Sequence, residues 1–304
     1  MHRAGLRRGR GLDVNAETLV DARATLGECP IWCERSGALY WTDIEAGTLS
    51  RWQAADRRVR HWQLPDRVGS FALCAQDGVV LLGLAEGIAL FDLARETLSP
   101  VVAVEADQPT TRINDGRCDR EGRFVFGMFD RDDAPRGHFY RVDGSLRIER
   151  LPLPAASVGN SIAFSPDGRT MYFGDSPTRT IWQVSYAPDG SIGTPSVFVR
   201  LGANDGYPDG STVDADGGLW NAQWQGGCVV RYDARGQESD RIKVPASQVT
   251  CPVFVGPALT KLCVTTARIG MDAAALAQQP DAGALFALAT PWQGLPESRF
   301  QVAR

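Results

Sequence analysis

Six short runs of mainly apolar residues recur along the chain at similar intervals. They are LYWTDI from Leu39, VVLLGL from Val79, RFVFGM from Arg123, TMYFGD from Thr170, GLWNAQ from Gly218 and KLCVTT from Lys261. Their starting positions are 40, 44, 47, 48 and 43 residues apart. Five of the runs follow a turn with glycine, and a second strand-like run follows each of the six; the turn glycines are Gly37, Gly78, Gly122, Gly168 and Gly217. Strand-rich content with a period of about 40 to 50 residues is typical of a β-propeller.

The repeat predicts an all-β fold, a six-bladed β-propeller with four antiparallel strands in each blade. A single blade cannot cover both of its faces, so it must pack radially against two neighbours. The segment MDAAALAQQ from Met271 has helical composition and lies inside the sixth repeat, where a surface insertion is tolerated. Two packed β-sandwiches would explain the strands but not the six-fold spacing. We expect one propeller domain over 15–304, after a disordered leader over 1–14 whose first ten residues carry four Arg and no acid.

The charge of the chain narrows the classes of partner. With 32 Lys and Arg against 36 Asp and Glu, the 304 residues carry a formal charge of −4, and no long basic run follows the leader. This balance predicts neither a nucleic-acid nor a membrane partner and favours a small neutral or anionic molecule. The sequence shows no stretch of 18 apolar residues and no signal peptide, so we expect a cytoplasmic protein. It does not predict an oligomeric state.

The cysteines do not form a recognisable framework. They are Cys29, Cys33, Cys74, Cys118, Cys228, Cys251 and Cys263, an odd number with no C-x-x-C pair. This spacing is unlike a disulfide scaffold or a structural zinc site and predicts reduced residues in the core. Cys29 and Cys33 could share a metal, but their surroundings match no zinc signature.

Polar residues occupy equivalent positions near the start of the first strand of five repeats. Counting back eight residues from the turn glycine, or nine in the first repeat, gives Glu28, Ser70, Asn114, Asn160 and Asp209. The first strand of a propeller blade lies beside the central channel, so these side chains should converge at one mouth. Two carboxylates with amide and hydroxyl oxygens suit a hard divalent cation better than a structural zinc. The alternative is a water-lined channel whose polar rim only satisfies strand ends.

Two further aspartates follow Asp209 in the segment YPDGSTVDADGGLW. Asp216 precedes Gly217, and Asp-Gly is favoured in tight turns because both residues tolerate positive φ. Asp214 is expected to cap the strand end or to face solvent. The segment lacks the ligand spacing, the mid-loop glycine and the closing glutamate of an EF-hand.

Other catalytic and cofactor classes lack their residues in this sequence. The histidines are His2, His61 and His138, and no G-x-S-x-G motif occurs, which disfavours a serine or cysteine hydrolase. The G-x-G-x-x-G and P-loop patterns of nucleotide sites are also missing.

Six motifs, in this order and spacing, resemble those of the regucalcin/gluconolactonase family, the senescence-marker-protein-like six-bladed propeller lactonases. They are GECPIW at 27–32, RINDGRCDREGRF at 112–124, GNSIAFSPDGRTMYFGDS at 159–176, YPDGSTVDADGGLW at 207–220, TCPVFVGP at 250–257 and the closing GALFAL from 283. The resemblance extends from about residue 16 to residue 300. It implies one divalent cation in the central channel, held by Glu28, Asn160 and Asp209.

The resemblance also implies a substrate site beside the cation. Arg112 and Asn114 match the substrate-contacting residues of the family, and an acidic contact should fall near Asp132. This chain reads FGMFDRDD there, with Asp where some relatives have Glu. Asp130, Asp132 and Asp133 are therefore not ranked.

The implied function is metal-dependent hydrolysis of a sugar lactone, of the gluconolactone, xylonolactone or arabinonolactone type, to the aldonic acid. The cation, which could be Ca²⁺, Mn²⁺, Zn²⁺, Fe²⁺ or Mg²⁺, would polarise the carbonyl, with Asp209 as ligand and general base. Arg112 would bind substrate oxygens through its rigid fork, unless it only pairs with Asp115 or Asp130. Trp224 is a candidate for lining the mouth. The alternatives are a non-catalytic calcium-binding propeller and a propeller esterase or phosphotriesterase.

Overall fold

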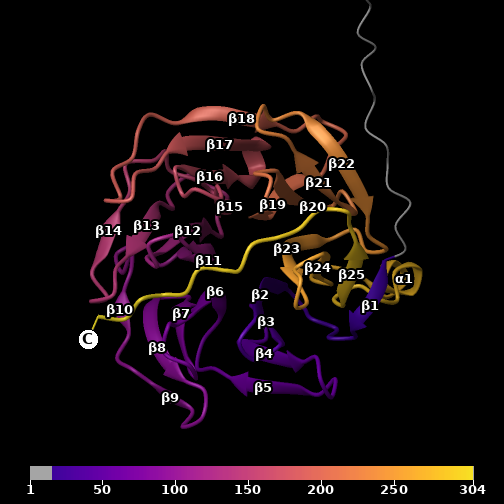
Figure 1. Ribbon diagram of the computed structural model, residues 1–304, viewed down its shortest axis with the longest axis horizontal. Coiled ribbons are helices and arrows are strands. Elements are labelled where there is room, and N and C mark those ends of the chain that lie inside the picture. Colours follow the sequence, from indigo (N-terminus) through magenta and orange to yellow (C-terminus); the bar gives the residue numbers. More distant parts are fainter. Residues whose placement is uncertain (1–15, 304) are drawn as a thin grey trace, which may run out of the picture.

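The computed structural model describes residues 16–303, which form six antiparallel sheets around a central axis (Figure 1). Each sheet has a path of four neighbouring strands, and the second carries one additional short strand. The prediction of an all-β, six-bladed propeller with four antiparallel strands per blade is confirmed. The cation in its channel stays a prediction, and the leader predicted at 1–14 lies outside the described residues.

In the first five blades the strands follow one another in sequence from the channel outwards, whereas the outer strand of the sixth blade is β1, Glu17–Val20 (Figure 1). The innermost strands are β2 (Gly27–Cys33), β6 (Val68–Leu73), β11 (Thr111–Cys118), β15 (Gly159–Phe164), β19 (Tyr207–Val213) and β23 (Val249–Val255). The second strands are β3 (Ala38–Asp43), β7 (Val79–Leu84), β12 (Phe124–Asp130), β16 (Thr170–Asp175), β20 (Leu219–Trp224) and β24 (Lys261–Thr266). The third strands are β4 (Thr48–Gln53), β8 (Gly87–Asp92), β13 (Phe139–Val142), β17 (Thr180–Ser185), β21 (Cys228–Tyr232) and β25 (Leu285–Ala289). The outer strands are β5 (Val59–Gln63), β10 (Val102–Ala103), β14 (Ile148–Arg150), β18 (Ser196–Arg200), β22 (Glu238–Lys243) and β1 (Glu17–Val20), and the additional β9 (Thr97–Leu98) pairs with β8.

The hydrophobic core lies between neighbouring blades. In β7, Val80, Leu82 and Leu84 pack with residues of the first blade, whereas Leu81 packs with residues of the third. Successive side chains of a strand point to opposite faces of the sheet, so a run that is apolar at every position is buried on both sides. Five clusters of this kind surround the axis. All seven cysteines are buried and free, as predicted.

The turn of the fifth blade shows what its two aspartates do. Gly217 has φ of +83°, a left-handed conformation that glycine adopts without steric cost. Asp214 caps this turn, because its carboxylate accepts from the N–H groups of Asp216 and Gly218. Asp214 is also fully buried and ion-paired with Arg231, so the solvent-facing alternative for Asp214 is wrong.

The ring is closed by the first strand of the described chain. β1 pairs antiparallel with β25 and supplies the outer strand of the sixth blade. The repeat did not reveal this pairing, because β1 precedes the first repeat and pairs with the last one. Hydrogen bonds between segments far apart in sequence therefore hold the first and last blades together.

The segment after β25 crosses one face of the propeller, where it is drawn in yellow in Figure 1. We call residues 293–303 the C-terminal strap. Its main chain hydrogen-bonds to Leu259 in the sixth blade, Ala215 in the fifth, Leu73 in the second and Gly122 in the third. These partners lie at or beyond the carboxyl ends of inner strands, or in the turns that follow them. The strap therefore covers this end of the channel.

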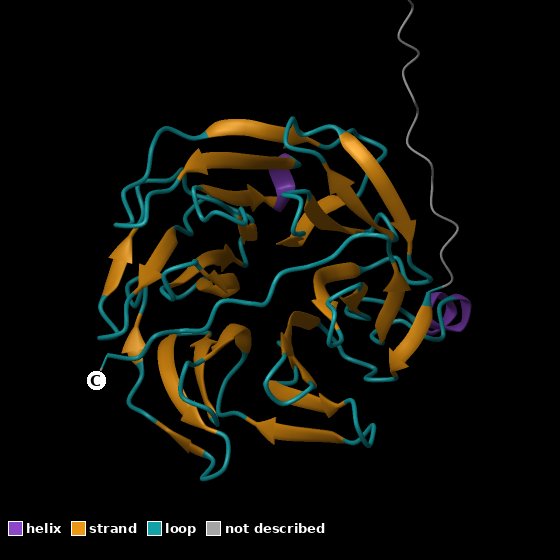
Figure 2. Cartoon of the chain, viewed as in Figure 1, coloured by secondary structure: helices purple, strands orange, loops and turns teal. Residues whose placement is uncertain are grey.

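Two short helices interrupt the strands of the described part (Figure 2). The helix α1 (Ala273–Gln278) confirms the predicted insertion, and Asp272 caps it by accepting from the N–H of Ala275 at 2.8 Å. The 3₁₀ helix η1 (Ser176–Thr178) lies between β16 and β17. Within 16–303, neither helix has the length and apolar character needed to cross a membrane.

Candidate active site

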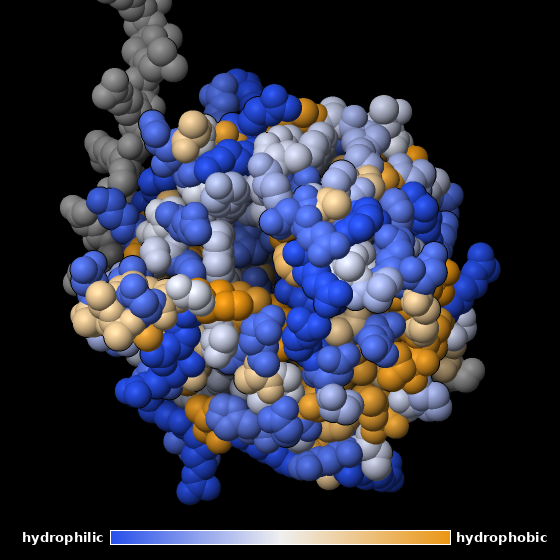
Figure 3. Space-filling view, turned by 180° about the vertical axis from the view of Figure 1, so that it is seen from behind, coloured by the Kyte–Doolittle hydropathy of each residue, from blue (hydrophilic) through white to orange (hydrophobic). Residues whose placement is uncertain are grey.

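The amino-terminal ends of the inner strands line a cavity of about 600 Å³ at the mouth opposite the strap. Figure 3 shows this face of the molecule, which is hollowed near its middle. Aromatic and apolar residues form much of the wall: Ile44, Phe129, Val158, Pro177, Tyr207 and Trp224. The polar lining includes Glu28, Arg112, Asn114, Asn160 and Asp209. A cavity of this size with a few convergent polar groups is typical of a small-molecule site.

Four of the five polar positions counted from the turn glycines line this cavity, and Ser70 does not. Ser70 lies after the β-bulge of β6, whereas Asn160 lies before the bulge of β15. The residue of the second blade that corresponds to Asn160 is therefore Gly69. A Cβ atom on Gly69 would lie 2.2 Å from the carbonyl oxygen of Ile113, so the second blade has no room for a side chain there.

Every inner strand has a register shift against the second strand of its blade near the cavity. Cys29 and Ser161, directly after Glu28 and Asn160, have φ of +48° and +59°. A bulge of this kind bends the strand and re-aims its side chains. Here it lets the site residues point into the channel while the rest of the strand keeps its alternation between the blade faces.

A chain of hydrogen bonds fixes the amide groups of the site. Arg112 Nη1 donates to Asn114 Oδ1 at 2.8 Å, and Asn114 Nδ2 donates to Asn160 Oδ1 at 3.0 Å. Asn160 Nδ2 donates to the Ser176 hydroxyl at 2.9 Å, and this hydroxyl donates to the carbonyl of Pro208 at 2.7 Å. Each amide is an acceptor at one end and a donor at the other. The chain therefore determines which way both amides face.

The carboxyl groups of Glu28 and Asp209 lie within hydrogen-bonding reach of each other. Burial, followed by the charge of Asp115, raises the pKa of Glu28 from its ordinary value of 4.5 to about 8. Burial and the charge of Glu28 raise the pKa of Asp209 well above its ordinary range. Among the described residues, neither carboxyl group forms an ion pair with a basic side chain. When both groups are ionised, the pair therefore concentrates negative charge, and the nearby charge of Arg112 offsets only part of it.

This arrangement fits a divalent cation. A cation would relieve the repulsion between the two carboxylates, and the side-chain oxygen of Asn160 could serve as a further metal ligand. Within 16–303, no group of three or more His, Cys, Asp and Glu side chains is arranged to hold a metal, so a cation here would need the Asn160 amide oxygen beside the two carboxylates. Oxygen donors favour Ca²⁺, Mg²⁺ or Mn²⁺.

The raised pKa of Glu28 predicts how pH acts on the metal-free protein. In the unfolded chain this carboxyl ionises near its ordinary pKa of 4.5, whereas in the folded protein it keeps its proton up to about 8. Stability should therefore fall as pH rises between these values, because the unfolded state releases its proton first. A bound cation replaces that proton, so the rise in Tm on adding Ca²⁺ should be larger at about pH 8 than at about pH 5. Thermal unfolding with chelator measures the stability of the metal-free protein at each pH, and unfolding with Ca²⁺ measures the rise in Tm. An equal rise at the two pH values would contradict the prediction.

Arg112 is buried and lines the cavity. Its guanidinium lies over the Phe129 ring, 4.4 Å from the centroid, and its Nε has no hydrogen-bond partner. Burial lowers the pKa of Arg112 to about 10, so the group is charged at neutral pH. Within the described residues, the alternative pairing with Asp115 or Asp130 is not observed, and Asp130 pairs with Arg136 instead.

The three aspartates at the end of β12 and after it have different environments. The Asp130 carboxylate is fully buried and accepts from Arg136 Nε at 2.5 Å, and Asp132 pairs with the same guanidinium at 2.6 Å. The Asp132 side chain is half exposed and does not line the cavity. Asp133, with φ of +53°, does line it. The structure therefore brings Asp133 to the site and leaves the predicted Asp132 outside it.

Two aromatic residues of the cavity wall lie side by side, and one of them was predicted from the sequence. Trp224 lines the cavity as predicted, and it is paired across the β19–β20 ladder with Tyr207, which was not predicted. The sequence could have indicated that Tyr207 lines the cavity, because it lies two residues before Asp209 and alternate residues of a strand face the same side.

Fold and site together define the class: a six-bladed β-propeller with a small-molecule cavity and an oxygen-donor set at one mouth of its channel. The chain belongs to the SMP-30/gluconolactonase/LRE-like family, whose model matches residues 26–268. The predicted resemblance to the regucalcin/gluconolactonase family is confirmed.

Similar proteins include named lactone hydrolases. The L-arabinolactonase of Azospirillum brasilense is 48% identical over 94% of this chain and 95% of its own length. The 6-deoxy-6-sulfogluconolactonase of Pseudomonas putida is 34% identical over 91% of this chain and 95% of its own. Among solved structures, a calcium-binding protein, regucalcin, from Agrobacterium tumefaciens matches with a TM-score of 0.90 and 32% identity, covering 94% of this chain and 97% of that one.

Proposed function

We propose that this protein is a sugar lactonase that uses one divalent cation to hydrolyse an aldono-lactone to the aldonic acid. The observation that carries the proposal is the buried pair Glu28 and Asp209, which shares a cavity of about 600 Å³ with Arg112, a residue without an ion pair in the described part of the chain. The similarity to an L-arabinolactonase over nearly the whole chain favours a five-carbon lactone.

Glu28, Asn160 and Asp209 would hold the cation. Their oxygens suit Ca²⁺, and the similar Agrobacterium tumefaciens protein is described as calcium-binding. A cation bound there supplies Lewis-acid polarisation of the lactone carbonyl.

The other steps are carried by side chains of this protein. Arg112 and Asn114 orient the lactone through hydrogen bonds to its oxygens, and the wall of the cavity limits access of bulk water. Asp209 accepts a proton from the attacking water as the water oxygen bonds to the carbonyl carbon. The bond between that carbon and the ring oxygen then breaks, and Asp209 returns the proton to the ring oxygen. The product is the open hydroxy acid.

Asp133 is the proposed acidic contact for substrate hydroxyls. Replacing Asp133 by Asn should raise KM for the preferred lactone about 10-fold with little change in kcat, because one charge-assisted hydrogen bond is lost. Asn tolerates the positive φ of this residue, so the backbone is preserved. Asp132→Asn is the matched control and should leave KM unchanged. A larger effect at Asp132 would reverse the assignment.

The test of the function is acid release from a panel of pentono- and hexono-lactones in weak buffer with a pH indicator. Protein stripped with chelator should be inactive and should regain turnover when refilled with a single cation, Ca²⁺ above all. Turnover that survives chelation would refute the metal requirement. Calorimetric Ca²⁺ binding without turnover of any lactone would favour a non-catalytic calcium-binding propeller.

A further inference from the structure

The loop at 201–206 leads directly into the strand that carries the proposed base. It joins β18 to β19, and Tyr207 is the first residue of β19, two positions before Asp209. Tyr207 lines the cavity beside its cross-strand partner Trp224. The conformation of this loop therefore determines where one wall of the substrate cavity stands.

Arg179, in the turn after η1, holds this loop from the fourth blade. Its Nη1 donates to the carbonyl oxygens of Asp205 at 2.5 Å and Gly206 at 2.8 Å, with a longer bond of 3.3 Å to Gly202. Its guanidinium lies over the Tyr207 ring, 4.0 Å from the centroid. A cation over an aromatic face attracts the ring, and the two hydrogens of this one nitrogen are shared among the three carbonyl oxygens. One side chain thus fixes both the loop and the ring that follows it.

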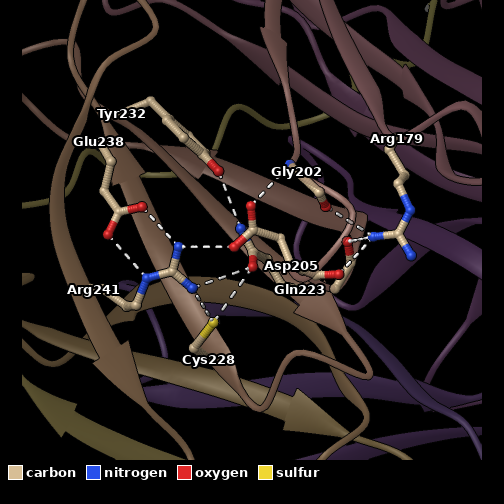
Figure 4. Close-up of polar contacts among 9 residues, drawn as sticks. Arg179, Gly202, Asp205, Gln223, Cys228, Tyr232, Glu238 and Arg241 are labelled. Atoms are coloured by element: carbon tan, nitrogen blue, oxygen red, sulfur yellow. Dashed lines mark hydrogen bonds and ion pairs between the residues drawn. The ribbon is translucent and has the colours of Figure 1, made fainter.

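A second arginine holds the same loop from the fifth blade (Figure 4). Arg241 Nη2 contacts Asp205 Oδ1 at 3.3 Å, and the other oxygen of Asp205 accepts from the N–H of Gly202 at 2.9 Å. Arg241 is itself held by Glu238 through two hydrogen bonds of 2.9 and 2.7 Å. The loop is therefore fastened by Arg241 of the fifth blade and by Arg179 of the fourth.

We propose that Arg179 is a positioning residue that holds Tyr207 as a wall of the cavity and so favours smaller lactones over larger ones. This inference rests on the proposed lactonase function. Arg179 is not among the residues that line the cavity, so it acts through Tyr207. Without these bonds the loop keeps its contact with Arg241, but Gly206 and the Tyr207 ring lose their attachment to the fourth blade and can shift outwards. The cavity then widens, a small lactone loses wall contacts and a larger lactone gains room.

The decisive variant is Arg179→Met, which keeps an unbranched side chain and removes the donors and the charge. For a five-carbon lactone we expect KM to rise about 10-fold with kcat within about 3-fold of wild type, the usual size of an effect on hydrophobic pocket shape. The ratio of kcat/KM for six-carbon over five-carbon lactones should rise by a similar factor. Ca²⁺ affinity measured by calorimetry should not change. The matched control is Arg235→Met in the neighbouring fifth blade, because the exposed Arg235 side chain makes no hydrogen bond within 16–303.

A double-mutant cycle tests the route through Tyr207. Tyr207→Leu should reproduce the change in selectivity, and Arg179→Met should add nothing to it in the double variant, because both remove the same wall. Additive effects would overturn the proposal, as would a fall in kcat with unchanged KM. Because Tyr207→Leu leaves Arg179 in place, it also keeps the proposal testable if Arg179→Met does not fold.

Limited trypsin digestion separates failure of the inference from failure of the proposed function. The exposed Arg200 precedes the loop, so cleavage after Arg200 should be faster in Arg179→Met than in Arg235→Met. Unchanged cleavage would refute the positioning role even if lactones are hydrolysed. Faster cleavage with unchanged selectivity would refute the specificity role. If the wild-type protein hydrolyses no lactone, the specificity role falls with the function, and the digestion alone decides whether Arg179 fixes the loop.

Discussion

Replacing Asp209 by Asn should lower kcat for lactone hydrolysis by about 10³-fold while the protein remains folded. Asn has nearly the same shape as Asp, so the packing of β19 is preserved, but an amide cannot accept the proton of the attacking water. The main-chain carbonyl of Asp209, which accepts from Ser161 Oγ at 2.6 Å and Asn221 Nδ2 at 2.9 Å, is unaffected by the change. The measurement is steady-state hydrolysis of the preferred lactone, with circular dichroism to verify the fold.

Asp209 is also a proposed ligand of the cation, and this role must be separated from its role as base. The assay is therefore run over a series of Ca²⁺ concentrations up to saturation. Loss of a carboxylate ligand should raise the concentration needed for half-saturation, whereas loss of the base should leave kcat low even when the site is full. Asp216→Asn is the control, because Asp216 is exposed in the turn of the same blade, and it should keep wild-type kcat. Wild-type kcat for Asp209→Asn at saturating Ca²⁺ would refute the assignment of the base.

The fold was predictable because each blade repeats the same local signals. Turn glycines such as Gly217 mark the hairpin between the first and second strands, and the apolar run of β7 shows that both of its faces are buried. Counting back from the glycine identified Asn114, Asn160 and Asp209 because each of them lies in or directly before the bulge of its inner strand. These site residues could thus be predicted from the repeat of the sequence.

The features that the sequence did not predict depend on contacts that do not repeat from blade to blade. Ser70 was wrongly predicted to line the cavity, because the bulge of β6 lies farther from its turn glycine than the bulges of the other blades do. The residue at the cavity position is Gly69, which packs against the backbone of Ile113. The sequence could not rank Asp132 against Asp133, because the ion pair with Arg136 decides which of them turns away. Ring closure by β1 and the crossing of the strap are pairings between distant segments, and no short window of sequence shows both partners.

Glu297→Gln should be the most destabilising conservative substitution in the strap. Glu297 is an ion-pair partner of Arg117 in the channel, and the two side chains are only 14% and 11% exposed. Arg117 also donates to the carbonyl oxygens of Ile162 at 3.2 Å and Ser211 at 2.8 Å, so its guanidinium joins the third, fourth and fifth blades to the strap. A buried charge that loses its partner costs about 3 to 5 kcal/mol of stability. Because Gln can still accept one hydrogen bond, we expect a loss of about 3 kcal/mol.

Denaturant unfolding of metal-loaded protein measures the effect, and two comparisons establish its cause. Glu96→Gln breaks the exposed pair with Arg60, whose side chains are 60% and 52% exposed, and should cost less than about 1 kcal/mol. The double variant Arg117→Met, Glu297→Leu removes both charges, so it should be less destabilised than Glu297→Gln alone, since no unpaired guanidinium remains in the channel. If Glu297→Gln were no more destabilising than Glu96→Gln, the ion pair would not be what fastens the strap. Tertiary packing such as that of the fully buried Phe300 would then hold it in place.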